Sequence, residues 1–291
     1  MKKPIEVLAE GLGHPEGPDV LPDGRVVYAN TYASEVGVWE PTKGKGTYAY
    51  TGGGPNACVL GSDGCIYVTQ SPTVGAWVPD DPRPGSIQKV WPDGRAEILC
   101  TEVAGVPLNA PNDLCFGPDG RLYFTDSGDW DPVGKPHPGY ICVVDRDGTA
   151  HVVEELEPVY PNGLVVEEDG SVVWVESYTR DVWRQRPDGK REHLRTLPEG
   201  HIPDGFKIAA DGNFWITSFS SGGLDVVAPN GRYVDFVETG GVPLNCCFVG
   251  DSLVICDFGT TDTSGPAPMC GRLLKVDVGV SGRPVARGSV G

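Results

Sequence analysis

Short apolar runs alternate with polar turns along the whole chain. In five of the six repeats two runs flank an Asp-Gly turn, as in DLCFGPDGRLYFTD and GLVVEEDGSVVWVE, and in the sixth they flank Asp251. Two β-rich runs joined by Asp-Gly predict a β-hairpin. No run of ten residues combines apolar positions at helical spacing with helix caps. The pattern therefore predicts an all-β chain.

A second hairpin follows in most repeats, with turns at residues 92–95, 146–149, 187–190 and 229–232, so each repeat is predicted to hold four antiparallel strands. The first turns recur at intervals of 40 to 56 residues, which is close to the length of one propeller blade. Their anchors are Asp23, Asp63, Asp119, Asp169, Asp211 and Asp251. Six repeats fill the chain and predict a single six-bladed β-propeller over residues 1–291. A β-sandwich or two small β domains are the alternatives.

The two ends of the chain complement each other. The last repeat runs out after its third strand, whereas the chain begins with a segment that resembles a fourth strand. We therefore expect the ring to close by pairing Ile5 to Glu10 with Arg272 to Val278, which removes two exposed sheet edges. Residues 279–291 are predicted to form a poorly ordered tail.

Six oxygen-bearing side chains stand at one repeated position, seven residues before the first five anchors and six before the last. They are Glu16, Asn56, Asn112, Asn162, Asp204 and Asn245. In a closed ring these side chains, which we name the crown, point at one axis. Oxygen donors without His or Cys suit calcium first, then magnesium or manganese. Taken alone, Asn56 and Asn245 are equally well explained as ordinary turn residues.

A second polar ring and two long loops are expected on the crown side. The ring lies at the ends of the second strands and comprises Asn30, Gln70, Asp126, Glu176, Ser218 and Asp257. These residues are predicted to orient metal ligands or bind substrate hydroxyls, with plain strand-end hydrogen bonding as the alternative. The loops, residues 71–85 and 127–139, bring Trp77, Trp130 and His137 over the crown as walls, unless they are solvent-exposed decorations.

The formal net charge of −17 and the pI near 4.6 argue against nucleic acid or an anionic membrane as a partner. No apolar stretch approaches membrane-spanning length, and the first residues lack the apolar core of a signal peptide. We therefore expect a cytoplasmic protein with a small-molecule partner. The oligomeric state is left open.

Four motifs together resemble the gluconolactonase and regucalcin family of six-bladed propellers, which includes senescence marker protein and luciferin-regenerating enzyme. They are HPEGP, PNDLCFGPDGRLYFTDS, PNGLVVEEDG and PDGFKIAADGNFWITSF. The resemblance implies one catalytic divalent cation held by Glu16, Asn162 and Asp204, with Asn112 beside it. Calcium is the first expectation, and magnesium, manganese, zinc or iron are alternatives. Asp204 resembles the residue that takes the proton of the attacking water.

The resemblance further implies hydrolysis of a lactone, usually of a sugar acid, to the hydroxy acid. The predicted substrate-binding residues are Asn112, Asp113, Asp126, Trp130 and His137. Ala110 stands where related proteins carry an Arg that grips sugar hydroxyls, which favours the bacterial gluconolactonase-like branch and keeps a less polar lactone open. The alternatives are a hydrolase of another ester, a phosphotriester or a cyclic amide, a calcium- or ligand-binding propeller without turnover, and a strictosidine-synthase-like propeller. Asp126 is the second candidate for the base.

Overall fold

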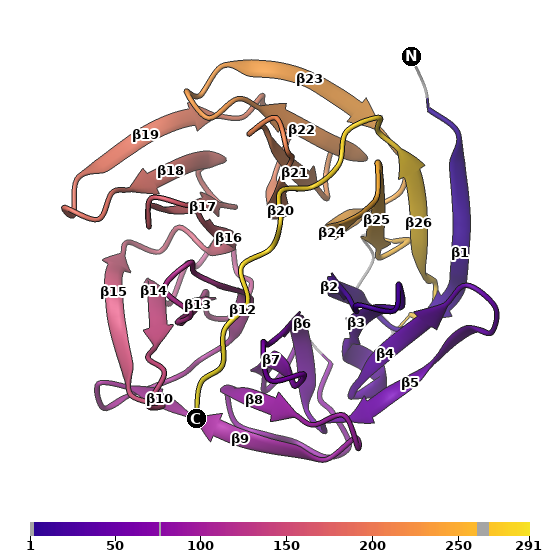
Figure 1. The fold of residues 1–291 in the computed structure, drawn as a ribbon. Coiled ribbons are helices and arrows are strands. Elements are labelled where there is room, and N and C mark those ends of the chain that lie inside the picture. Colours follow the sequence, from indigo (N-terminus) through magenta and orange to yellow (C-terminus); the bar gives the residue numbers. More distant parts are fainter. Residues whose placement is uncertain (1–2, 76, 261–267) are drawn as a thin grey trace.

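The computed structural model describes residues 3–75, 77–260 and 268–291. Six four-stranded antiparallel sheets are arranged around a central axis, as Figure 1 shows. The prediction of an all-β, six-bladed propeller is confirmed.

The strands of each blade succeed one another from the axis outward. Blade 1 holds β2 (Pro15–Val20), β3 (Val26–Asn30), β4 (Glu35–Glu40) and β5 (Gly44–Tyr50), and blade 2 holds β6 (Gly54–Leu60), β7 (Ile66–Ser71), β8 (Ser86–Val90) and β9 (Ala96–Cys100). Blade 3 holds β12 (Pro111–Phe116), β13 (Leu122–Asp126), β14 (Gly139–Val144) and β15 (Ala150–Leu156), and blade 4 holds β16 (Pro161–Val166), β17 (Val172–Glu176), β18 (Asp181–Gln185) and β19 (Arg191–Thr196). Blade 5 holds β20 (Pro203–Ile208), β21 (Phe214–Ser218), β22 (Gly223–Val227) and β23 (Tyr233–Glu238), and blade 6 holds β24 (Pro243–Val249), β25 (Ser252–Asp257), β26 (Gly271–Asp277) and β1 (Ile5–Leu12). A short pair, β10 (Glu102–Val103) with β11 (Val106–Pro107), and one 3-10 turn, η1 (Thr31–Ala33), complete the described elements.

Local sequence explains the blades. In each Asp-Gly turn the aspartate carboxylate accepts a backbone N–H two residues on, as Asp23 does from Arg25 at 3.1 Å, and the glycine adopts a positive φ, +85° at Gly24. The second strands are buried on both faces because they pack against neighbouring blades, whereas outermost strands such as β15 and β19 consist mostly of exposed and half-buried positions. The core therefore lies between blades, around the axis.

The ring closes as predicted. β1 pairs antiparallel with β26, in a register that runs from Ile5 opposite Val276 to Leu12 opposite Gly271. β1 thus becomes the outermost strand of a blade whose other three strands come from the end of the propeller sequence (Figure 1).

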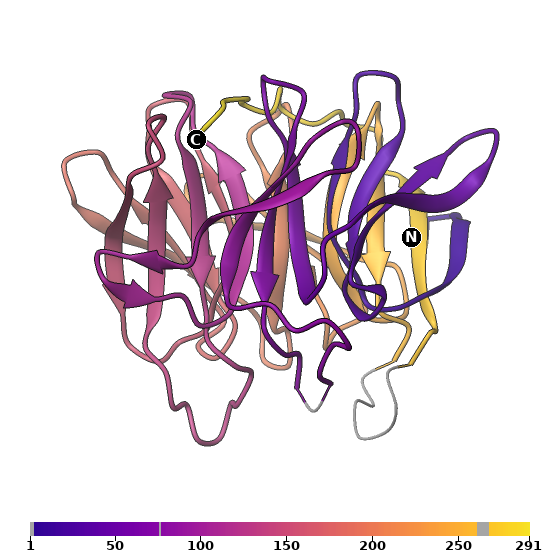
Figure 2. The ribbon, with the colours of Figure 1, turned by 90° about the horizontal axis from the view of Figure 1, so that it is seen from below.

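The prediction of a loose tail at residues 279–291 is wrong. This segment crosses one end of the central channel and finishes beside β9, and it lies on the face opposite the long loop after β13 (Figures 1 and 2). It pairs with blade 5 at Ala209 and Gly282. Arg287 forms an ion pair with buried Asp19 of blade 1, with Nη2 at 3.0 Å from Oδ1, and Val290 is 1% exposed within the core of blades 2 and 3.

We predict that deleting residues 281–291 lowers the free energy of unfolding by about 3 kcal/mol or more. The deletion exposes the core around Val290, and it leaves the buried carboxylate of Asp19 without the guanidinium group of Arg287. Urea denaturation of the truncated and full chains measures the difference. Arg287→Ala should reproduce part of the loss, whereas Arg283→Ala removes a charge from the same segment without touching Asp19. Identical denaturation midpoints for the truncated and full chains would contradict the prediction.

In the described part of the chain, no helix has the length and apolar character needed to cross a membrane.

Candidate functional site

Each innermost strand breaks its regular pairing at the crown residue or directly beside it. The pairing of β2 with β3 is interrupted between Glu16 and Asp19, that of β16 with β17 between Pro161 and Leu164, and the same irregularity recurs in the other four blades. Such bulges re-aim a side chain that would otherwise follow the pleat. Six equivalent bulges therefore explain how one repeated position is directed toward the axis.

Small residues after the crown positions allow the innermost strands to meet. A Cβ added to Gly17 would lie 2.1 Å from Cα of Ala57 in the next blade, and one added to Gly205 would lie 2.0 Å from Cγ of Asn245. A side chain at either position would push two blades apart. The Glu-Gly and Asp-Gly pairs of blades 1 and 5 are thus packing requirements as well as turn signals.

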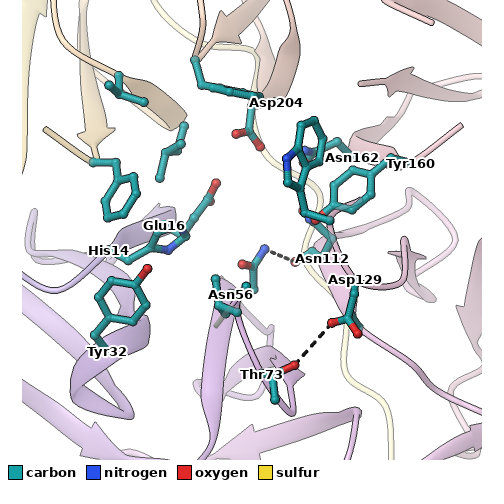
Figure 3. Close-up of a pocket in the computed structure, with 18 of the residues that line it drawn as sticks. His14, Glu16, Tyr32, Asn56, Thr73, Asn112, Asp129, Tyr160, Asn162 and Asp204 are labelled. Carbon is teal, nitrogen blue, oxygen red and sulfur yellow. Dashed lines mark hydrogen bonds between the residues drawn. The ribbon is translucent and has the colours of Figure 1, made fainter. Parts of the chain in front are cut away.

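A cavity of about 220 Å³ opens at the crown end of the channel, and five of the six crown residues line it. They are Glu16, Asn56, Asn112, Asn162 and Asp204. Figure 3 shows the carboxylates of Glu16 and Asp204 converging from blades 1 and 5, with Asn56 and Asn112 entering from the opposite side. Asn245 is different, because its Oδ1 accepts the N–H of Cys246 at 2.9 Å and lies 3.4 Å from Nζ of Lys207.

Two carboxyl groups share this buried floor. Burial raises the pKa of Glu16 well above its usual range, and the negative charges of Asp204 and Asp113 raise it further. Burial likewise raises the pKa of Asp204, again with a contribution from Asp113, while the amide of Asn162 opposes the shift. Without a cation the ionised forms of both carboxyl groups are thus disfavoured, and a bound divalent cation would stabilise them.

The amide of Asn162 provides an independent sign of a ligand. Its Nδ2 donates to Oγ of Ser177 at 3.2 Å, which fixes the orientation of the amide. Its Oδ1 is buried and has no hydrogen-bond partner among the described residues. A buried, unpaired oxygen is costly unless a partner from outside the chain satisfies it.

These donors fit a hard divalent cation. Two carboxylates and one bare amide oxygen from Glu16, Asp204 and Asn162 form an all-oxygen set. In the described chain no group of three or more His, Cys, Asp and Glu side chains could hold a metal ion, so a centre at the crown depends on the asparagine. Asn112 lies in the same cavity, and its backbone carbonyl accepts from Asn56 at 3.1 Å and from Thr69 at 2.5 Å, which ties blade 3 to blade 2 (Figure 3).

The predicted substrate-binding residues divide into two groups. Asn112 and Trp130 line the cavity, but Asp113, Asp126 and His137 do not. Both carboxylate oxygens of Asp126 accept backbone N–H groups, from Asn109 at 2.9 Å and from Ala110 at 2.7 Å. The substrate-binding role and the alternative role as base predicted for Asp126 are therefore corrected, because both oxygens of this carboxylate are occupied by backbone N–H groups of the residues that precede β12.

Two other members of the second ring make similar strand-end contacts. Asn30 accepts the N–H of Gly13 at 2.9 Å, and Asp257 forms an ion pair with Arg272 at 3.2 Å. Strand-end hydrogen bonding, the alternative considered for these positions, describes these members of the ring.

Asp113 faces the other end of the channel. It lines a separate cavity of about 360 Å³ under residues 281–287, where its Oδ2 lies 3.9 Å from Nζ of half-buried Lys207. Burial lowers the pKa of Lys207, but the negative charge of Asp113, with smaller contributions from other groups, outweighs this effect and holds the pKa above its usual value. The prediction that Asp113 contacts substrate is corrected, because this side chain points away from the crown cavity.

Sequence reasoning missed the residues that form most of the cavity wall. They are His14, Tyr32, Tyr160, Phe219 and Phe258, together with Val242 and Leu244. A signal existed in the repeat: His14 and Tyr160 stand two residues before crown positions, and Phe219 and Phe258 directly follow second-ring positions.

Backbone strain marks two of these missed residues. His14 has φ +56° and Tyr160 has φ +55°. Bulky residues rarely occupy this left-handed region, which costs of order 1–3 kcal/mol and clusters at functional sites. Burial lowers the pKa of His14 to about 4, so its ring is neutral at pH 7.

A family model described as the SMP-30/gluconolactonase/LRE-like region matches residues 12–255. A gluconolactonase from Zymomonas mobilis subsp. mobilis is 26% identical over 283 residues, which cover 84% of this chain and 76% of that protein. Among solved structures, the calcium-binding protein regucalcin from Agrobacterium tumefaciens superposes with a TM-score of 0.79 at 18% identity, over 100% of this chain and 98% of its own. A gluconolactonase from Xanthomonas campestris superposes with a TM-score of 0.73 at 20% identity, over 94% of this chain and 89% of its own. At these identities the two structures establish a shared fold.

Proposed function

This chain belongs to the SMP-30/gluconolactonase/LRE-like family, and from that membership and the cavity floor we propose that it is a divalent-cation-dependent lactonase. The membership supports lactone hydrolysis in general. The observation that carries the metal requirement is the bare, buried Oδ1 of Asn162 beside the two converging carboxyl groups.

Glu16, Asn162 and Asp204 would hold the cation, and Asn112 lies beside them. A bound divalent cation supplies a Lewis acid that polarises the lactone carbonyl. Calcium is our proposal, because all the donors are oxygens and a related propeller is a calcium-binding protein.

The remaining roles belong to side chains of this protein. Asp204 is buried on the floor and accepts the proton of the attacking water. The water oxygen bonds to the carbonyl carbon, the ring C–O bond breaks, and the proton returns to the departing ring oxygen to give the hydroxy acid. Among the described residues, Asp129 is the other carboxylate besides Glu16 and Asp204 that lines this cavity, but its Oδ1 accepts from Thr73 at 3.3 Å toward the rim (Figure 3). The aromatic wall limits water entry and so strengthens the electrostatic interactions of the floor.

Turnover of three substrate classes tests the proposal: a lactone panel and a phosphotriester, followed by acid release in a pH-stat, and a cyclic amide, followed by the amine that its opening frees. We expect turnover of lactones that is lost when the cation is removed by a chelator. Turnover confined to the phosphotriester or the cyclic amide would replace lactonase by the related hydrolase. Absence of turnover with all three classes, in protein shown to contain its cation, would favour a binding propeller.

A further inference from the structure

One side of the crown cavity is a continuous apolar arc. Val242, Leu244 and Phe258 form a buried cluster against which Tyr32 and Phe219 pack. Trp130 extends this arc, with its ring centroid 5.6 Å from that of Phe219. Residues from blades 1, 3, 5 and 6 thus present one apolar surface beside the crown.

Most polar residues of the described lining lie on the floor and the opposite side, although the arc adjoins the ring of His14, whose centroid is 4.5 Å from that of Phe258, and includes the hydroxyl group of Tyr32. Asn56 and Asn112 enter from that side, and Thr73 and Asp129 lie near the rim (Figure 3). Ala110 also lines the cavity and offers only a methyl group. A ligand on the floor therefore meets hydrogen-bonding groups along one edge and apolar surface along the other.

Positive charge is missing from the described lining, which contains neither Lys nor Arg. The residues outside the described part, Ala76 and the segment TDTSGPA at 261–267, contain none in their sequence. The described lining contains three carboxyl groups, from Glu16, Asp129 and Asp204. The cavity at the other end of the channel differs, because Lys207, Arg283 and Arg287 line it.

These features discriminate between classes of lactone. An anionic lactone, such as a sugar lactone with a phosphate or a second carboxylate, would bring negative charge to a cavity without a basic side chain. A polyhydroxylated lactone would place some hydroxyl groups against the purely apolar side chains of the arc, such as Val242, Leu244 and Phe258, where they lose water without gaining a partner. An alkyl or aryl substituent on the same ring gains from burial there.

Resting on the proposed lactonase function, we propose that the preferred substrate is a neutral lactone with an apolar alkyl or aryl substituent. Its carbonyl lies over the crown, and its substituent packs against the arc. Trp130 and Phe219 are the specificity-determining residues, because they form the outer part of the arc, which only a substituent beyond the lactone ring reaches.

Four lactones with the same six-membered ring test this assignment: δ-valerolactone, its pentyl-substituted form, glucono-δ-lactone and the 6-phosphate of glucono-δ-lactone. We expect kcat/KM for the pentyl compound to exceed that for δ-valerolactone by about tenfold or more, since several buried methylenes contribute. Glucono-δ-lactone should be poorer than the pentyl compound, and its phosphate poorest.

Variants of the arc test whether the arc causes the preference for the pentyl-substituted lactone. Trp130→Ala should reduce the ratio of kcat/KM for the pentyl compound to that for δ-valerolactone at least threefold, and Trp130→Phe should restore most of it. Tyr50→Ala is a matched control, because Tyr50 is an exposed aromatic residue on β5 outside the cavity, and its ratio should equal that of the unaltered protein.

Binding of unreactive lactams separates this inference from the proposed activity. Calorimetry with δ-valerolactam and its pentyl-substituted form should show at least tenfold tighter binding of the substituted compound. Glucono-δ-lactone as the best of the four lactones, or equal binding of the two lactams, would overturn the substrate class and leave lactone hydrolysis standing. Selective lactam binding by a protein that opens no lactone would support the arc and overturn the proposed function.

Discussion

Replacing Asp204 by Asn should lower the rate of lactone opening by roughly two to four orders of magnitude, the usual contribution of a positioned acid or base. The amide keeps an oxygen donor and nearly the same shape, so the cation should remain at reduced affinity. It cannot accept a proton from the attacking water. The measurement pairs single-turnover rates with the metal content of Asp204→Asn and of the unaltered protein.

Asn56→Ala is the comparison variant, because Asn56 occupies the same repeat position in blade 2 but donates its Nδ2 to the backbone carbonyl of Asn112. Its rate should fall less than tenfold. Should Asp204→Asn keep both its metal and near-normal turnover, the base lies elsewhere in the cavity, and Asp129→Asn is the next variant to measure.

Deleting residues 1–10 should abolish cooperative folding, because β1 completes blade 6 and also contacts blade 1. The backbone carbonyl of Leu8 accepts from Nε1 of Trp39 at 3.1 Å, and that of Gly11, next to the deleted segment, accepts from Nζ of Lys45 at 3.1 Å. Without β1, β26 becomes an exposed edge strand, and the pairing of β1 with β26 that closes the ring is lost. We expect a loss of about 5 kcal/mol or more, comparable with the whole stability of an ordinary domain.

Thermal and urea unfolding followed by circular dichroism measure this loss. Removing only Met1 and Lys2, which precede the strand, should leave the transition unchanged. A chain without residues 1–10 that unfolds at the same temperature as the full chain would show that the pairing of β1 with β26 contributes nothing to stability.

The blades, the closure of the ring by the first strand and the crown could be predicted from the sequence because they follow the repeat. Fixed spacing between Glu16 and Asp23, and between Asn162 and Asp169, places these residues at the same point of each blade, and six such points surround one axis. The pairing of Ile5 to Glu10 with Arg272 to Val278 followed because a four-strand unit lacked one strand at the end of the chain.

Features outside the repeat were less predictable. Asp126 stands at the expected strand end, but spacing does not reveal that the N–H groups of Asn109 and Ala110 occupy its carboxylate. Asp113 follows a crown residue at the bulge, where the turn of the backbone decides which end of the channel the side chain faces.

The strap formed by residues 281–291 was missed for a related reason. It is held by isolated contacts of Arg287 and Val290, which follow no period. The apolar arc likewise depends on single aromatic residues brought together by different blades, such as Trp130 and Phe219.

Whether Glu16, Asn162 and Asp204 together hold the cation on which lactone opening depends is tested most directly by a metal titration of the chelated protein. Elemental analysis before and after chelation gives the metal content, and lactone opening is followed as Ca²⁺ is added back. We predict that activity disappears with the metal and returns at one equivalent per chain. Full activity in the chelator, in protein that elemental analysis finds free of metal, would contradict the cation-dependent mechanism.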